Sequence, residues 1–271
     1  MMIGAAVGID HRSDTINTPE DVNLHLKQPF LGPVPLVRGG KDPLLAASAS
    51  DFRESFQAVR TSLLARYPDP GTKILIVTSA RPQEGKTITA TNLALALAYG
   101  GARVLLIDGV IRRPGLHRPL RLTNERGLSE VLNGQARVRD VIQRTVDPNL
   151  LVITGGKTPR HPSELLSSER MKTLLANLAN GPFDWVLIDT PPVLTVNDAI
   201  VLAPSVAGVV CVIGAGMTRG VQAQRAVDTI LLANPRSVSI VLDQVDCSRD
   251  TSDGARPAGR QDRKTDAGAS V

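Results

Sequence analysis

Aromatic residues are scarce in this sequence of 271 residues, in which Phe, Trp and Tyr together make up 3% of the chain. A core with so few rings must be built mainly from Leu, Val, Ile and Ala, which fits layered strands and helices better than an aromatic-girdled barrel. Cysteine is also rare, because Cys211 and Cys247 are the only two. Two cysteines cannot form a disulfide framework, and the apolar run around Cys211 is typical of a small core residue in a reducing compartment. No apolar run approaches the roughly 18–20 residues that span a bilayer. This composition excludes collagen, a membrane bundle and a disulfide scaffold.

The chain has a modest basic excess, with a net charge of +5 and a pI of about 9.6. Its arginines are scattered, with small basic clusters at Arg112–Arg113 and Arg263–Lys264, and few aromatics lie between them for base stacking. We interpret the excess as a solvated, slightly basic surface and expect no nucleic-acid partner.

Three segments differ in composition. Residues 1–50 are rich in Pro, Gly, Asp and Ser, which predicts an irregular N-terminal arm with one short helix near 19–26. Its first dozen residues open with a short apolar run. This run is either the end of a membrane helix from a longer parent protein, which would make the arm a juxtamembrane remnant, or a disordered start. Residues 51–246 have the pattern of a folded domain. Residues 247–271 are polar, carry mixed charge and are predicted to be a disordered tail.

Within residues 51–246, apolar strands alternate with helical patterns. A helix is expected at 51–66, where apolar side chains recur at helical spacing. We expect strands at 73–78, 103–108, 150–154, 185–189, 208–213 and 238–242, and helices at 87–99, 128–132, 138–144, 163–179 and 219–232. Continuous Val/Ile/Leu strands between helices predict an α/β fold with a parallel β-sheet flanked by helices on both faces, a three-layer arrangement.

The strongest functional signal is a phosphate-binding loop between the first of these strands and its helix. Residues 80–87 read Ala-Arg-Pro-Gln-Glu-Gly-Lys-Thr, which resembles the P-loop of nucleoside triphosphatases except that Ala80 replaces the usual first glycine. In such loops the backbone N–H groups bind phosphate, and the lysine, here Lys86, reaches the β- and γ-phosphates. The hydroxyl of the next residue, here Thr87, ligates Mg²⁺. We therefore expect ATP and Mg²⁺ as cofactors, with a merely structural turn as the alternative. The predicted nucleotide-binding residues are Pro82, Gln83, Glu84, Gly85, Lys86, Thr87 and Ile88.

Two further apolar strands end in a carboxylate, at Asp108 and Asp189. Because parallel strands end at one edge of a sheet, both side chains are expected to face the phosphate loop. Thr87, Asp108 and Asp189 are the predicted metal ligands, although an aspartate at a strand end also serves as a turn or helix cap. Arg112 and Arg113 follow the first carboxylate and suit anionic oxygens, or lie on the surface.

Together these motifs resemble the bacterial tyrosine kinases that act with membrane polysaccharide co-polymerases in capsule and exopolysaccharide biosynthesis and export. The resemblance runs from about residue 54 to 246, and further matches include Gly127-Leu128-Ser129, Pro162-Ser163-Glu164 and Asp198-Ala199. It implies a P-loop NTPase fold and transfer of phosphate from Mg-ATP to tyrosine. It also implies that Lys86, Asp108 and Arg112 are catalytic, with Asp108 activating the tyrosine hydroxyl.

The same resemblance implies partners and a location. These are a membrane polysaccharide co-polymerase or a membrane region missing from this chain, a tyrosine-bearing protein substrate, and a homo-oligomer ring formed through the helix that carries Glu54 and Arg60. The expected location is cytoplasmic, at the inner face of the bacterial plasma membrane. Gln57 stands where the family has an arginine in this helix, so one charge of the subunit contact is missing.

Other departures from the family pattern concern the chemistry. Val110 stands where the family has its second carboxylate, and a valine neither binds metal nor accepts a proton. The tail lacks the family's tyrosines, because Tyr67 and Tyr99 are the only two in the chain. Asp243 replaces an asparagine that the family places near the base. Three hypotheses follow: a protein-tyrosine kinase, a catalytically weakened ATP-binding scaffold that regulates a co-polymerase, and a partitioning-type ATPase. Arg81 argues against the third, since those proteins have a signature lysine there.

Overall fold

A computed structural model describes residues 14–37 and 50–246 of the protein. The first dozen residues and the tail from residue 247, for which we predict a membrane-helix end or disordered start and a disordered tail, lie outside the described residues. Within these residues, no helix combines the length and apolar character that crossing a bilayer requires.

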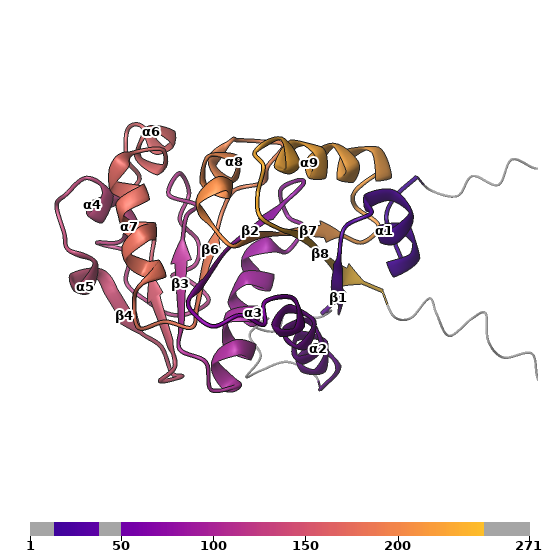
Figure 1. The fold of residues 1–271 in the computed structure, drawn as a ribbon, viewed down its shortest axis with the longest axis horizontal. Coiled ribbons are helices and arrows are strands. Elements are labelled where there is room, and N and C mark those ends of the chain that lie inside the picture. The colour runs from indigo at the N-terminus through magenta and orange to yellow at the C-terminus, as the bar shows by residue number, and fades with distance from the viewer. Residues whose placement is uncertain (1–13, 38–49, 247–271) are drawn as a thin grey trace, which may run out of the picture.

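One eight-stranded sheet runs through the described residues, with helices on both faces (Figure 1). The strands are β1 (Phe30–Pro35), β2 (Lys73–Ser79), β3 (Val104–Asp108), β4 (Ile142–Arg144), β5 (Leu150–Ile153), β6 (Trp185–Asp189), β7 (Gly208–Gly214) and β8 (Val238–Val245). Their order across the sheet is β1-β8-β7-β2-β6-β3-β5-β4, and only β4 runs antiparallel to its neighbour. The predicted parallel α/β sheet is confirmed.

The helices divide between the two faces because strand side chains alternate in direction. They are α1 (Pro19–Leu26), α2 (Ser50–Arg66), α3 (Lys86–Tyr99), α4 (Leu128–Leu132), α5 (Val138–Val141), α6 (Pro162–Leu166), α7 (Glu169–Ala179), α8 (Asp198–Leu202) and α9 (Gly220–Leu232), with a 3₁₀ turn at Ala203–Ser205. In β2, Ile74 and Ile76 join the core beneath α1, α7 and α9, whereas Leu75 and Val77 join the core beneath α2 and α3. Figure 1 shows α2 and α3 together on one side of the sheet.

The N-terminal segment differs from the irregular arm that we predicted. The expected short helix forms as α1, capped by Thr18 and Asp21, and it packs against α9. Residues 30–35 form β1, which pairs in parallel with β8 at the edge of the sheet. Ile16, Leu31 and Val34 are buried. The described part of this segment is therefore ordered and packed against the sheet, and the prediction that it is irregular was wrong.

Two predicted helices also differ from the structure. The segment 138–144 is helical only through Val141, after which Ile142 adopts extended backbone angles and begins β4. The helix expected at 163–179 is divided into α6 and α7, because the Ser168 hydroxyl accepts a hydrogen bond from Met171 N and begins a new helix. The other expected strands and helices form within a few residues of the predicted bounds.

Candidate active site

The phosphate loop connects β2 to α3 and has the backbone shape of an anion-binding turn. Gln83 and Gly85 have positive φ angles of 71° and 83°. Left-handed residues of this kind let successive backbone N–H groups form a concave site for an anion. Gly85 is required at its position, because a Cβ atom there would lie 1.8 Å from Asp243 Oδ2. The 14-residue helix α3 begins at Lys86, so its N-terminus adds a positive dipole end to the loop.

The side chain of Glu84 binds the phosphate loop to the neighbouring strand β7. Its buried carboxylate accepts hydrogen bonds from Arg81 N, from Gly214 N at 3.2 Å and from the Thr218 hydroxyl. Burial raises the pKa of Glu84, although these hydrogen bonds oppose the shift. The side chain thus ties the loop to the end of β7 and to the segment before α9. Because its carboxylate is engaged in these three hydrogen bonds, Glu84 can contact a nucleotide only through its backbone N–H.

Lys86, Thr87 and Asp189 converge at the start of α3. The Thr87 hydroxyl donates to Asp189 Oδ2 at 2.7 Å, and Lys86 Nζ lies 3.2 Å from that hydroxyl and 4.0 Å from Asp189 Oδ1. Asp189 is buried, and this burial raises its pKa to about 6 despite the nearby Lys86 ammonium. The second carboxylate oxygen, Oδ1, is buried without a hydrogen-bond partner. An unsatisfied carboxylate oxygen beside a hydroxyl is a donor set that suits Mg²⁺.

Asp108 lies directly across from Asp189, since the two residues are paired in the register of β3 and β6. Its carboxylate is held by three backbone amides: Val110 N donates to Oδ1, and Gly115 N and Leu116 N donate to Oδ2, each at 3.0 Å. Burial nevertheless raises the pKa of Asp108 above its usual value. The three amides fix the direction of the carboxylate, and Oδ1 keeps more free acceptor capacity than Oδ2.

Comparison with known proteins gives one domain family and several relatives. The family described as an AAA domain matches residues 72–222. "Tyrosine-protein kinase YwqD" of Bacillus subtilis is 37% identical over 189 residues, which cover 70% of this chain and 79% of that protein. The chain belongs to the bacterial tyrosine-protein kinases.

Other relatives agree with this assignment. "Tyrosine-protein kinase ptk" of Acinetobacter johnsonii is 42% identical over 163 residues, 59% of this chain, and the matched region spans only 22% of that longer protein. The kinase domain of Escherichia coli tyrosine kinase ETK has 30% sequence identity and a TM-score of 0.79, covering 90% of this chain and all of that one. A cobyrinic acid a,c-diamide synthase from Mycobacterium smegmatis, solved with ADP and magnesium, has 25% identity and a TM-score of 0.51 over 64% of this chain and 74% of that one.

In this kinase-family chain, Arg112 is bound to residues far away in the sequence. Its guanidinium pairs with the buried Asp198 at the start of α8, at 3.2 Å from Nε to Oδ2, and also donates to the Ser163 hydroxyl on α6. Ser163 in turn donates to Asp198 Oδ1 at 3.1 Å. The sequence reasoning named Ser163 and Asp198 only as family matches and gave them no role. The structure shows that they fix Arg112 and the loop that follows β3.

Val110, in place of the second carboxylate, is half-buried, and its backbone N–H donates to Asp108 Oδ1. Within the described residues no group of three or more His, Cys, Asp or Glu side chains forms a metal site. The assignment of Thr87, Asp108 and Asp189 as ligands of Mg²⁺ stays a prediction, and the structure brings Thr87 and Asp189 into direct contact, with Asp108 opposite Asp189 in the sheet register. The remaining ligands of such an ion would come from phosphate oxygens and water, as is usual for Mg²⁺.

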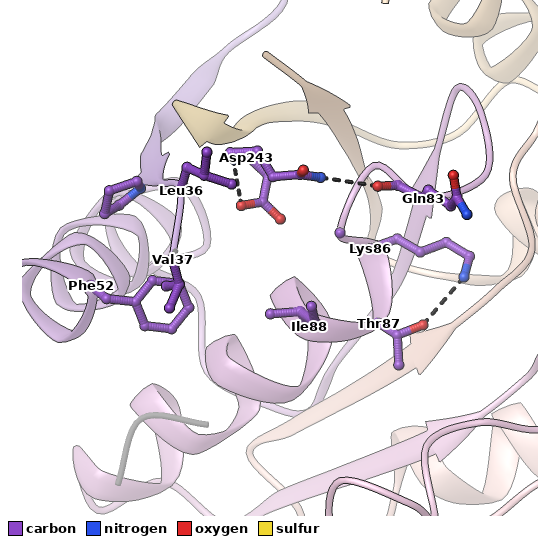
Figure 2. A pocket seen from close by; sticks show the side chains of 11 residues that line it. Leu36, Val37, Phe52, Gln83, Lys86, Thr87, Ile88 and Asp243 are labelled. Carbon is purple, nitrogen blue, oxygen red and sulfur yellow. Dashed lines mark hydrogen bonds between the residues drawn. The ribbon is translucent and has the colours of Figure 1, made fainter. Parts of the chain in front are cut away.

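Beside the phosphate loop lies a cavity of about 440 Å³, which the sequence reasoning missed (Figure 2). Its walls come from the loop, the start of α3, the ends of β1 and β8, and Phe52 of α2. The lining residues are Pro35, Leu36, Val37, Phe52, Gln83, Gly85, Lys86, Thr87, Ile88, Asp243 and Gln244. Leu36, Val37 and Phe52 give it an apolar side opposite the loop. Leu36 and Val37 reach the cavity because β1 pairs with β8, and no local pattern in the sequence predicts that pairing.

Asp243 connects this cavity to the loop. Its Oδ2 accepts from the Thr89 hydroxyl at 3.1 Å and its Oδ1 from Gln244 N at 2.7 Å, while Gln244 Nε2 donates to Gln83 O at 3.0 Å. Burial raises the pKa of Asp243 to about 6. The end of β8 thereby holds the phosphate loop from the cavity side, as Glu84 holds it from the β7 side.

Proposed function

We propose that the chain transfers the γ-phosphoryl group of Mg-ATP to a tyrosine hydroxyl on another protein, as part of capsule or exopolysaccharide biosynthesis and export. The observation that carries this proposal is the convergence of Lys86, Thr87 and Asp189 at a P-loop, with Asp108 fixed beside them. Family membership supports the same reaction.

The proposed roles follow from the positions of the side chains. Lys86 and the N-terminus of α3 bind the β- and γ-phosphates, whose negative charge they offset. Thr87 and Asp189 hold Mg²⁺, which neutralises charge that develops on the phosphates when it is bound. The cavity between Phe52 and Asp243 receives the base of the nucleotide, because its apolar walls suit a flat heterocycle.

Asp108 orients the acceptor hydroxyl and takes its proton at Oδ1. Three amide donors keep the carboxylate in one direction, so the hydroxyl meets an acceptor that is already in place. A pKa above the usual range makes this carboxylate a stronger base than an exposed aspartate. Arg112, fixed by Asp198 and Ser163, holds the loop that supplies those amides.

The acceptor tyrosine belongs to another chain in this proposal. Tyr99 ends α3, about 20 Å from Lys86 at the ordinary helical rise. The Tyr67 hydroxyl lies against Gly208, at the opposite end of β7 from the phosphate loop. Neither described tyrosine is therefore within reach of Asp108.

The proposed partners are a membrane polysaccharide co-polymerase and other copies of this chain, at the inner face of the plasma membrane. For the ring, Glu54 and Gln57 are exposed on α2, whereas Arg60 donates to Ala96 O at 3.0 Å and so is engaged within its own chain. We propose that Glu54 contributes more than Arg60 to any contact between copies.

The test is incubation of the full chain with Mg-ATP and a tyrosine-bearing acceptor, followed by detection of phosphotyrosine. We expect acceptor phosphorylation that is lost in Lys86→Met and retained in Lys172→Met, a control on an exposed lysine of α7. The second candidate is the ATP-binding scaffold, which Val110 favours. Tight ATP binding without phosphotyrosine or phosphate release would select the scaffold.

A further inference from the structure

Exposed basic side chains gather on two loops that leave the carboxyl ends of β3 and β5. The six that are exposed, here named the basic rim, are Arg113, Arg118, Arg121, Arg126, Lys157 and Arg160. Four of them lie in the segment 109–126, which contains five arginines and one acidic residue, Glu125. That segment alone has a net charge of +4, against +5 for the entire chain.

The basic rim borders the carboxylate proposed to activate the acceptor. Gly115 and Leu116, whose amides bind Asp108, stand between Arg113 and Arg118 in the same loop. Arg118 N also donates to Gly115 O at 3.2 Å, so the chain turns back beside the site. The basic rim therefore begins a few residues after Asp108, on a loop whose amides are hydrogen-bonded to the Asp108 carboxylate.

The second loop is attached to the first. Asn124 Nδ2 donates to Gly156 O and Gly156 N donates to Asn124 Oδ1, both at 2.9 Å. A Cβ atom on Gly155 would lie 2.8 Å from the side chain of Pro114, which shows how closely the two loops pack. Lys157, which follows Gly156 directly, therefore extends the same basic surface.

The charges of the basic rim are not neutralised within the chain. Arg112, their neighbour, is paired with Asp198, whereas none of the six rim side chains has an ion pair or a side-chain hydrogen bond to any residue that the structure describes. Glu125 offsets one charge at most. A surface of exposed, unpaired guanidinium groups attracts carboxylates, which each of these groups can bind with two hydrogen bonds.

We propose that the basic rim binds an acidic segment flanking the acceptor tyrosine of the protein substrate. This inference rests on the proposed kinase function and names its substrate class. A tyrosine whose hydroxyl reaches Asp108 places its neighbouring residues over the loops around 113–126 and 157–160, where Asp or Glu side chains meet arginine. An anionic membrane is the less suitable occupant, because a bilayer lying on the rim would cover the approach to Asp108.

The test compares peptides that differ only beside the tyrosine. One peptide carries three Glu residues flanking Tyr, a second has Gln at those positions, and a third has Lys. Each exposed pair of opposite charges contributes little, so we expect three pairs to raise kcat/KM for the Glu peptide by about 5- to 10-fold over the Gln peptide at low salt. The ratio should fall toward one as NaCl screens the charges, and the Lys peptide should be the poorest substrate.

Reversing the charge of two rim residues tests whether the preference for the Glu peptide arises at the basic rim. In Arg118→Glu/Arg121→Glu we expect the Glu-to-Gln ratio of kcat/KM to fall to about one or below. The matched control, Arg225→Glu/Arg236→Glu, makes the same change in net charge on α9 and before β8, and should keep the wild-type ratio. Melting temperatures show that each variant is folded, and Arg118→Gln/Arg121→Gln is the milder alternative if the reversal unfolds the chain.

The outcomes separate this inference from the kinase function. Equal rates on all three peptides would overturn the acidic-substrate inference and leave the kinase intact. Absence of phosphotyrosine on every peptide, with ATP bound, would overturn both. Binding to phosphatidylserine vesicles that is lost in Arg118→Glu/Arg121→Glu, together with a peptide ratio of one, would overturn the inference in favour of a membrane surface.

Discussion

Asp243 is predicted to destabilise the folded protein at neutral pH. Burial raises its pKa to about 6, from a value of 3.8 for an unperturbed aspartate. Between these two pH values the folded protein holds a proton that the unfolded chain has released, so the free energy of unfolding falls as the pH rises. The decrease in the free energy of unfolding is complete above a pH of about 6, the pKa of Asp243 in the folded protein. A difference of about two pKa units corresponds to about 3 kcal/mol, and the side chain is too buried for solvent to screen much of it.

Asp243→Asn removes this titration while keeping the size of the side chain and an oxygen that can accept from Thr89 or from Gln244 N. We expect the variant to be more stable than the wild type by about 1–3 kcal/mol at pH 7.5 and nearly equal to it at pH 4. Urea unfolding followed by the fluorescence of Trp185, the single tryptophan, measures both values. Asp189 has a similar pKa, so some pH dependence should remain.

The control is Asp69→Asn, which removes a carboxylate that is exposed in the loop before β2. It should change the stability by less than about 0.5 kcal/mol at either pH. An Asp243→Asn protein that is no more stable than the wild type at pH 7.5, or that keeps the full wild-type slope between pH 4 and pH 6, would refute the argument from burial.

Three further changes test the site. Lys86→Met should weaken ATP binding about 100-fold by calorimetry, because a charged contact to phosphate contributes about 1.5–3 kcal/mol; unchanged affinity would remove the lysine from the mechanism. Glu84→Ala should lower the unfolding free energy by about 3 kcal/mol, since two amides and a hydroxyl lose their buried acceptor, and a loss below about 1 kcal/mol would contradict that account. Val110→Asp should raise phosphotyrosine formation about 10-fold or more if the missing carboxylate limits the reaction; no gain in a folded variant would reject this explanation.

The core of the site could be predicted from the sequence because its geometry follows from the topology. A parallel sheet brings the carboxyl ends of its strands to one edge, so Asp108 and Asp189 had to lie near the loop between β2 and α3. The structure confirms the α/β sheet, and it pairs the two aspartates in register. The roles of the individual residues stay predictions.

The cavity walls could not be predicted, because they depend on an atypical strand. Pro33 and Pro35 lack an N–H group and normally argue against a strand, and Gly32 adds flexibility. These residues are tolerated in β1 because it is an edge strand with a neighbour on one side only. The partners of Arg112 were also beyond prediction, since local patterns carry no information about contacts between residues 112 and 198. The amides around Asp108 are local, and they agree with the alternative that a strand-end aspartate caps a turn.

The charges at the site predict that nucleotide binding and phosphoryl transfer respond differently to a change of residue 110. Two carboxylates, Asp108 and Asp189, face a single ammonium group from Lys86, and the phosphates of ATP add further negative charge. The cost of bringing these anions together is reduced only by the N-terminus of α3, by Lys86 and by a divalent cation. A third carboxylate at position 110 would raise that cost in the absence of Mg²⁺ but would add a ligand in its presence. We therefore expect Val110 to favour nucleotide binding in the absence of Mg²⁺, and to weaken both Mg²⁺ binding and phosphoryl transfer in its presence. ATP affinity and phosphotyrosine formation must be measured separately, with and without Mg²⁺, in the wild type and in Val110→Asp.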